Sequence, residues 1–300
     1  MTPITRTHDA RRRLGLSTIE MVTVIVVTGI LSVGLAGILR NPIQGYAAVS
    51  RRGELVDLAD LAMLRMSRDL RMALPNSVRV SPDGTVVELL HVAAGARYRG
   101  EPGINPSGRD HTAASDWLSF GGDASWNLIG RVSGLDFSYG TPLASGTRVA
   151  IYPTGSDVWS AAAANASPAI ISAASNAVTL IDDGDEDQIS LASAHRFSLG
   201  SPQGRLYLVD GPVTYLCDAS SGALWRVDRY AIAASQPTSL SATPLSSGAI
   251  ARAADRIERC AFDYVPGTPS RSGLVTLEVV IASDDERVRL LHQVPIPNAP

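Results

Sequence analysis

A long apolar run near the N-terminus is the strongest pattern in the chain. Residues 19–39 read IEMVTVIVVTGILSVGLAGIL, in which Glu20 is the only charged side chain, and Arg40 follows directly. About 20 residues of α-helix, each rising 1.5 Å, cross the roughly 30 Å hydrocarbon core of a membrane. We therefore predict a transmembrane helix over residues 16–40.

Beyond residue 40 the pattern becomes that of an amphipathic helix. Apolar residues recur every three or four positions, with charged side chains mostly between them. They are Leu55, Leu58, Ala62, Met66, Leu70 and Ala73. Residues 41–74 are therefore predicted to continue the same helix, with one face packed on a folded domain. Pro42 and Gly45 predict a kink or loosened junction. Pro75 predicts that the helix ends near Leu74.

The rest of the chain, residues 75–300, is predicted to form strands and long loops. A hairpin is expected over Ser77–Leu90, around the turn at residues 81–84. Further strands are expected at residues 135–139, 148–152, 177–181, 188–192, 205–209, 213–217, 223–230, 259–264, 273–281 and 287–294. The Gly-, Ser- and Ala-rich segments 96–125 and 156–176 are predicted to be surface loops. One long helix followed by a β-rich domain belongs to the α+β class.

Charge is distributed unevenly between the N-terminus and the rest. The chain carries a net charge of −3, yet residues 1–15 contain Arg6, Arg11, Arg12 and Arg13 against a single Asp9. Arginines before a membrane span predict a cytoplasmic N-terminus and a C-terminal part across the membrane. The remaining chain is acidic, so nucleic acid is not expected as a partner, because phosphate binding requires clustered cations.

The two cysteines are Cys217 and Cys260. Neither belongs to a C-x-x-C pair, and no cluster of histidines supports a structural zinc site. In an oxidising compartment they predict one disulfide bond, whereas in the cytosol they would remain two buried thiols.

The order of residues before the apolar run carries a more specific signal. A basic leader ends at Gly15, and Glu20 follows five residues later, at the start of the span. A carboxylate in a membrane segment is costly, so it is expected to have a partner or a purpose. The stretch Gly15-Leu16-Ser17-Thr18-Ile19-Glu20-Met21 resembles the N-terminal signal of the type IV pilin and pseudopilin superfamily. A plain signal anchor with an incidental acid is the alternative.

The resemblance implies a precursor that a prepilin peptidase cuts after Gly15. Residues 1–15 would be the leader peptide, and Leu16 would become the N-methylated mature N-terminus. Glu20 would neutralise the Leu16 amine of a neighbouring subunit in the apolar core of a filament. Leu16 and Ser17 depart from the commoner Phe and Thr of this signal. The implied fold is a pilin-like globular domain on a long N-terminal helix.

A narrower resemblance is scattered over the whole chain. Residues 70–80, 213–218, 291–295 and 298–300 are similar to minor pilins of the mannose-sensitive haemagglutinin (MSHA) pilus, the MshO type. This implies a subunit that primes or caps a filament, in the bacterial inner membrane with a periplasmic domain and then at the cell surface. Its implied partners are other minor pilins, a major pilin, an inner-membrane assembly platform with its ATPase, and membrane lipid.

Catalytic motifs are absent from the sequence, and we expect no enzyme. The five histidines are scattered singly and are expected to be solvated or satisfied in the core; they are His8, His91, His111, His195 and His292. Asp182, Asp183, Asp185 and Asp187 flank a glycine, and such oxygen ligands suit Ca²⁺. The alternative is an acidic, solvated turn between two strands.

Two further functions remain open at this point. A large minor pseudopilin of a type II secretion system would carry the same N-terminal signal. A tip-displayed adhesin would bind glycan through exposed aromatic residues such as Trp117, Trp126 or Trp159.

Overall fold

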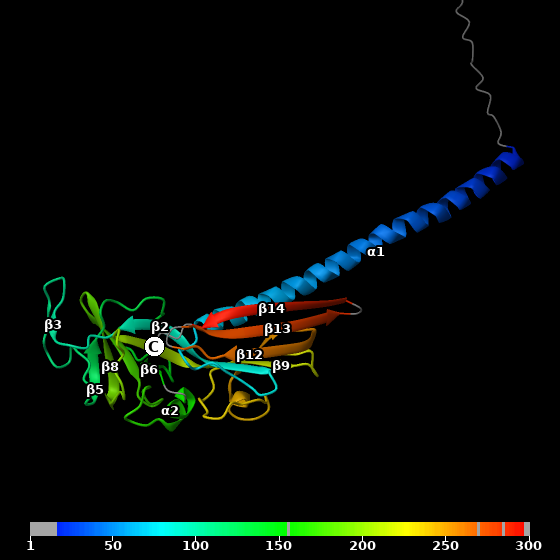
Figure 1. Ribbon diagram of the computed structural model, residues 1–300. Coiled ribbons are helices and arrows are strands. Elements are labelled where there is room, and N and C mark those ends of the chain that lie inside the picture. Colours follow the sequence, from blue (N-terminus) through cyan, green and yellow to red (C-terminus); the bar gives the residue numbers. More distant parts are fainter. Residues whose placement is uncertain (1–16, 155–156, 269–270, 284–285, 297–300) are drawn as a thin grey trace, which may run out of the picture. The chain divides into compact units, whose positions relative to one another are not determined.

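The computed structural model describes residues 17–154, 157–268, 271–283 and 286–296. Helix α1 (Thr18–Arg71) is followed by a β-rich part with one further short helix, α2 (Val158–Ala164) (Figure 1). The chain divides into two compact units, Met1–Gly53 and Glu54–Pro300. The predicted α+β class is confirmed.

Helix α1 runs without interruption through Pro42 and Gly45, where the sequence predicts a kink or loosened junction. It ends at Arg71, three residues before the predicted end at Leu74. The reason lies in the backbone: the Leu74 amide donates to the Leu90 carbonyl at 2.8 Å, and the Val92 amide donates to the Met72 carbonyl at 2.8 Å. Residues 72–74 therefore leave the helix to lie along the edge of strand β2.

The central sheet is antiparallel, in the order β1-β2-β9-β10-β11, with β6 also paired to β9. Its strands are β1 (Arg79–Val80), β2 (Val86–Arg97), β6 (Arg148–Ile151), β9 (Arg205–Asp218), β10 (Ala223–Asp228) and β11 (Ala249–Ala254). The predicted hairpin is present, because Arg79 pairs with Glu88 across the turn. The two strands predicted at residues 205–209 and 213–217 form one strand, joined at Gly211, whose φ of 139° suits a glycine.

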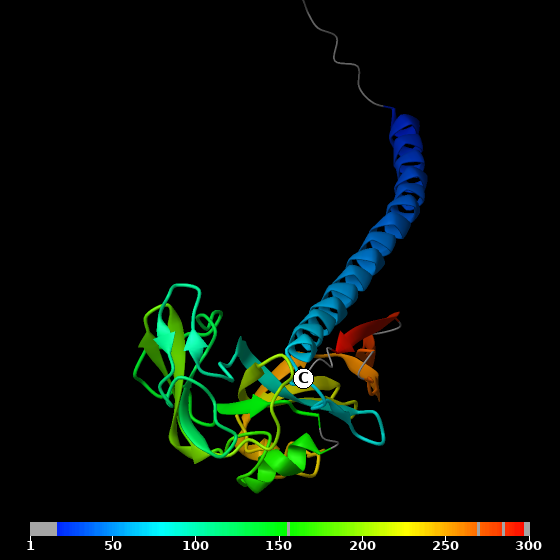
Figure 2. The ribbon, with the colours of Figure 1, turned by 60° about the vertical axis from the view of Figure 1, so that its left-hand side comes forward.

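Three smaller sheets complete the β-rich unit. The first contains β12 (Ile257–Val265), β13 (Gly273–Ser283) and β14 (Glu286–Ile296); the second contains β5 (Asp123–Asn127), β8 (Glu186–His195) and β7 (Val178–Asp183); the third pairs β3 (Gly103–Ile104) with β4 (Asp110–His111). Figure 2 shows the green and teal strands at one end of this unit and the orange and red strands at the other.

The unit has two main hydrophobic cores. In the first, Leu55, Met66 and Leu70 of α1 are fully buried against residues of the central sheet and of β12–β14. The amphipathic pattern of residues 55–73 therefore predicts the buried face of the helix correctly. The second core surrounds Trp126. It lies between the sheet of β5, β8 and β7 and the parts of β2 and β9 that contain Ala94 and Leu208.

Several predicted elements are wrong. Residues 135–139 form no strand; instead Leu135 and Phe137 pack irregularly against the second core. The predicted loop 156–176 contains α2, which Asp157 caps by accepting a hydrogen bond from the Ser160 amide at 2.7 Å. The predicted loop 96–125 contains β3, β4 and the start of β5, and β11 was not predicted. These segments are short or rich in alanine, so their periodicity is weak.

Candidate functional site

The first candidate site is the exposed apolar part of α1. Residues Thr18–Leu35 have a mean hydropathy of 2.0, none is buried, and by length and composition they can cross a membrane. Two of the hydroxyls in this segment bond within the helix: Thr23 donates to the Ile19 carbonyl at 2.8 Å and Ser32 donates to the Thr28 carbonyl at 2.7 Å. The segment therefore presents a nearly continuous apolar surface suited to lipid or to other apolar helices.

Glu20 is the exception on this surface. It lies in the first turn of α1, is exposed, and forms no ion pair with any residue that the structure describes. A carboxylate in the first turn is favoured by the helix dipole. Its charge is therefore compatible with the helix yet remains available to a cation from outside the described residues. Gly15 and Leu16, the expected cleavage site, lie outside the described residues.

The disulfide bond Cys217–Cys260 is present, as predicted. It joins β9 of the central sheet to β12 of the neighbouring sheet, across a sequence separation of 43 residues, and both cysteines lie in the first core. The bond fastens together the two sheets on which the buried face of α1 packs.

The second candidate site is the acidic hairpin of β7 and β8. Asp182 lies opposite Asp187, and Asp183 lies opposite Glu186, so like charges face each other in both pairs. Such pairs are unfavourable unless cations intervene. On one face Arg131 donates to Asp182 at 2.8 Å and lies 3.7 Å from Asp187. Asp187 is fully buried, and it also accepts from the Val132 amide at 2.7 Å.

The other face of the hairpin meets a buried polar network. Arg99 pairs with Glu186, and Arg109 pairs with Asp183. His111 is 1% exposed and lies 3.5 Å from Glu186. Asn127 donates to Asp183 at 2.6 Å. Each of these partners comes from outside the hairpin, between residues 99 and 127, in a region that the sequence predicts to be mostly loop.

These contacts change the interpretation of the acidic segment. In the described part of the chain no three His, Cys, Asp or Glu side chains are arranged to hold a metal ion. The four aspartates expected as Ca²⁺ ligands have arginine, amide and hydroxyl partners instead; at the turn, a hydrogen bond from Ser107 is the main reason that the pKa of Asp185 is lowered. The acidic segment lies at the turn between β7 and β8, where Glu186 and Asp187 are buried rather than solvated.

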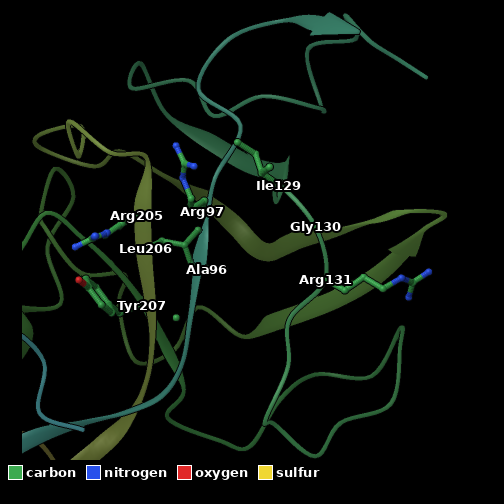
Figure 3. Close-up of a pocket in the computed structure, with 9 residues that line it drawn as sticks. Ala96, Arg97, Ile129, Gly130, Arg131, Arg205, Leu206 and Tyr207 are labelled. Atoms are coloured by element: carbon green, nitrogen blue, oxygen red, sulfur yellow. The ribbon is translucent and has the colours of Figure 1, made fainter. Parts of the chain in front are cut away.

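A shallow hollow of about 490 Å³ lies beside this hairpin, between Gly95–Arg97 of β2, Arg205–Tyr207 of β9 and residues 129–131. Arginines at positions 97, 131 and 205 line it. Figure 3 shows that their side chains point in different directions, and Arg131 is already engaged by the hairpin. The hollow therefore does not present three guanidinium groups to one anion.

The tryptophans proposed as glycan contacts are mostly covered. Trp126 is fully buried in the second core, and Trp159 is 6% exposed. The Trp159 indole donates to the Ser77 carbonyl at 2.8 Å, and the Arg79 guanidinium lies 3.7 Å from its ring centre. Trp117 is partly buried. The expectation of exposed aromatic residues is thus wrong for Trp126 and Trp159, because Trp126 belongs to the second core and Trp159 of α2 belongs to a smaller core with residues of β2, β6 and β9.

The histidines occupy separate places. His195 is buried, and burial lowers its pKa. His91 of β2 lies 2.8 Å from Asp210 of β9. His292 lies on β14, and His8 is outside the described residues. Of the four histidines that the structure describes, only His111 belongs to a polar cluster, and no feature of its sequence neighbourhood predicts that role.

Comparison of the chain with protein-family models, with curated proteins and with solved structures gives no match.

Proposed function

We propose that the chain is a membrane-anchored subunit of a type IV pilus-like filament, made as a precursor and cut after Gly15. The observation that carries the proposal is the exposed apolar segment Thr18–Leu35, which holds one acid, Glu20, in its first turn without a partner among the described residues. A simple membrane anchor does not require that acid. In a subunit packed among other apolar helices, the acid can bind the N-terminal ammonium of a neighbour.

The β-rich unit supports the same proposal. It packs on the end of α1, from Leu55 to Leu70, so that the helix is an integral part of the fold rather than a detachable signal. The disulfide Cys217–Cys260 is suited to an oxidising compartment, as expected for a domain that has crossed the bacterial inner membrane. We place the β-rich unit in the periplasm and then at the cell surface.

Within this class we assign the chain to the minor pilins of the MSHA type, where it would prime or cap the filament. The support for this narrower assignment is the sequence similarity at residues 70–80, 213–218, 291–295 and 298–300. Other minor pilins, a major pilin and the assembly platform would be its partners. A pseudopilin of a type II secretion system is the alternative within the class.

Intact-mass spectrometry of the membrane-extracted protein tests the proposal. The expected species begins at Leu16, is about 14 Da heavier for one N-methyl group and is about 2 Da lighter than its reduced form for one disulfide. The same protein from cells without prepilin peptidase should retain residues 1–15. A chain that keeps these residues in the presence of the peptidase, or that begins after the apolar segment, as expected from cleavage of an ordinary secretory signal, would contradict the proposal.

A further inference from the structure

The exposed face of α1 within the β-rich unit carries a segregated pattern of charge. We call it the charged stripe, and its members are Glu54, Asp57, Asp60, Leu61, Leu64, Arg65, Arg68 and Arg71, all of them exposed. At 3.6 residues per turn these positions lie on one side of the helix, opposite the buried face that begins at Leu55. Along the stripe the order is three acids, two leucines and three arginines.

Helix physics within one chain does not explain this order. Residues three apart on a helix are neighbours, so Glu54, Asp57 and Asp60 repel one another, as do the three arginines. Alternating acids and bases would remove that repulsion. The helix dipole favours arginines in the last turn, but it gives no advantage to acids three turns from the end. Of the charged side chains in the stripe, only Glu54 has an ion-pair partner among the described residues, Arg256 at 2.9 Å.

Two exposed leucines interrupt the charges. Leu61 is 47% exposed and Leu64 is 57% exposed. Apolar side chains flanked by charges of both signs are typical of a surface that another protein covers, since the apolar centre supplies burial and the charged rim fixes the register.

The stripe is complementary to itself when it is shifted by eleven residues. Glu54 then meets Arg65, Asp57 meets Arg68, and Asp60 meets Arg71. Eleven residues complete almost a whole number of helical turns, so the shift of roughly 16 Å along the axis keeps the same face toward the partner. All three acids find an arginine in a single register.

We propose that the charged stripe docks a second copy of this chain, with the two helices parallel and shifted by eleven residues. The parallel direction rests on the proposed membrane anchoring, because two copies inserted in the same membrane point the same way. An antiparallel pair would also place acids opposite arginines: Asp57 would still face Arg68, but Glu54 would face Arg71 and Asp60 would face Arg65.

Cysteine cross-linking of the full chain in membranes tests the register. Neither native cysteine is a free thiol, because Cys217 and Cys260 are joined to each other. Two differently tagged copies are co-expressed and oxidised, one with Asp60→Cys and the other with Arg71→Cys. A mixed dimer is expected. The matched pair Glu54→Cys with Arg71→Cys should give none, since residues 54 and 60 lie about 9 Å apart along the helix. A dimer from the Glu54→Cys and Arg71→Cys pair without one from the Asp60→Cys and Arg71→Cys pair overturns the proposal. No dimer with either pair also overturns it.

Charge reversal tests the cause of docking. Asp57→Arg, added to both cross-linking partners, should reduce the dimer at least about fivefold, because it faces Arg68 of the other copy. Adding Arg68→Asp to the same chains should restore the dimer, since the two charges are then exchanged. Glu101→Arg, an equal charge change in a loop outside α1, should leave the dimer unchanged. An equal loss with Glu101→Arg, or no restoration, overturns the proposal.

The result is separable from the proposed function. Cleavage after Gly15 and methylation of Leu16 are measured by mass on the same membranes. A correctly processed chain without the Asp60–Arg71 cross-link would refute docking in this register and leave the filament proposal intact.

Discussion

The hydroxyl of Tyr215 on β9 donates a hydrogen bond to Asp69 of helix α1 at 2.9 Å. Arg226 of β10 donates to the same Asp69 oxygen at 2.7 Å. Burial raises the pKa of Tyr215, with the charge of Asp69 adding to the effect, so the phenol stays protonated as a donor. This three-residue contact is a polar link between α1 and the central sheet, beside an otherwise apolar interface.

Removing this link should destabilise the β-rich unit. Asp69→Ala leaves the buried Tyr215 hydroxyl without its acceptor and Arg226 with only Asp228, so we expect the free energy of unfolding to fall by about 2–3 kcal/mol. Urea denaturation of the purified chain in detergent, followed by circular dichroism, measures the change. Asp57→Ala, on the exposed face of the same helix, is the control and should change the stability by less than about 0.5 kcal/mol. Equal effects would show that the link contributes nothing.

The disulfide should contribute to stability by a different route. Replacing both Cys217 and Cys260 with alanine opens a loop of sequence separation 43 in the unfolded chain. We expect a loss of about 2–4 kcal/mol, chiefly because the unfolded state gains conformational entropy. Urea denaturation of the variant, compared with the oxidised and the reduced native chain, measures the loss. The reduced native chain should resemble the variant, and a reduced chain as stable as the oxidised one would contradict the prediction.

His91 and Asp210 should make stability depend on pH. The hydrogen bond to Asp210 is the main reason that the pKa of His91 is raised above 6.5, against the opposing effect of burial. The folded state therefore binds this proton more tightly than the unfolded state. The stabilisation is complete below pH 6.5 and is lost as the pH rises through the raised pKa.

Thermal unfolding between about pH 5.5 and pH 8.5 checks the sign. The native chain should exceed Asp210→Asn in Tm most strongly at the acidic end, and the difference should shrink as the pH rises. The effect is small because both side chains are partly exposed. Asp263→Asn, at an exposed carboxylate, should show a constant difference. A constant difference for Asp210→Asn as well would mean that this pair does not hold the proton.

Neutralising Glu20 should separate assembly from membrane insertion. Glu20→Gln keeps the size of the side chain and removes its charge, so the proposed attraction to a neighbouring N-terminus is lost. We expect the amount of the chain in sheared filaments to fall at least about tenfold, with the membrane-bound amount unchanged. Immunoblotting of both fractions measures the ratio, and Glu101→Gln is the control. Normal incorporation of Glu20→Gln would contradict the role given to this acid.

Local patterns in the sequence were sufficient for the elements with strong periodicity. The buried face of α1 between Leu55 and Leu70, the hairpin at residues 77–90 and the paired strands β13 and β14 follow from spacing and turn residues alone. Helix α2 was missed because its alanine-rich sequence lacks a polar and an apolar face. The prediction of a strand at residues 135–139 is wrong because the apolar residues of this segment pack against the second core without forming a strand pair.

The acidic hairpin shows why the candidate site was only half predictable. The sequence places four aspartates around Gly184, and oxygen-rich loops of this kind suit calcium. Whether such carboxylates meet a metal or an arginine depends on residues distant in the chain. Arg109 lies 74 positions from Asp183, and Arg131 lies 51 positions from Asp182. No pattern of neighbouring residues in the sequence predicts contacts between positions so far apart in the chain.

The sequence by itself determined the apolar helix, its lone acid at position 20 and the α+β class, because burial and backbone hydrogen bonding act on consecutive residues. The tertiary structure alone decided the partners of the hairpin carboxylates, the burial of Trp126 and Trp159, and the link from Asp69 to Tyr215. It also decided which side of α1 stays exposed, and hence that three acids and three arginines share one stripe. These features depend on which distant segments the fold brings together, since ion pairs and packing act through space rather than along the chain.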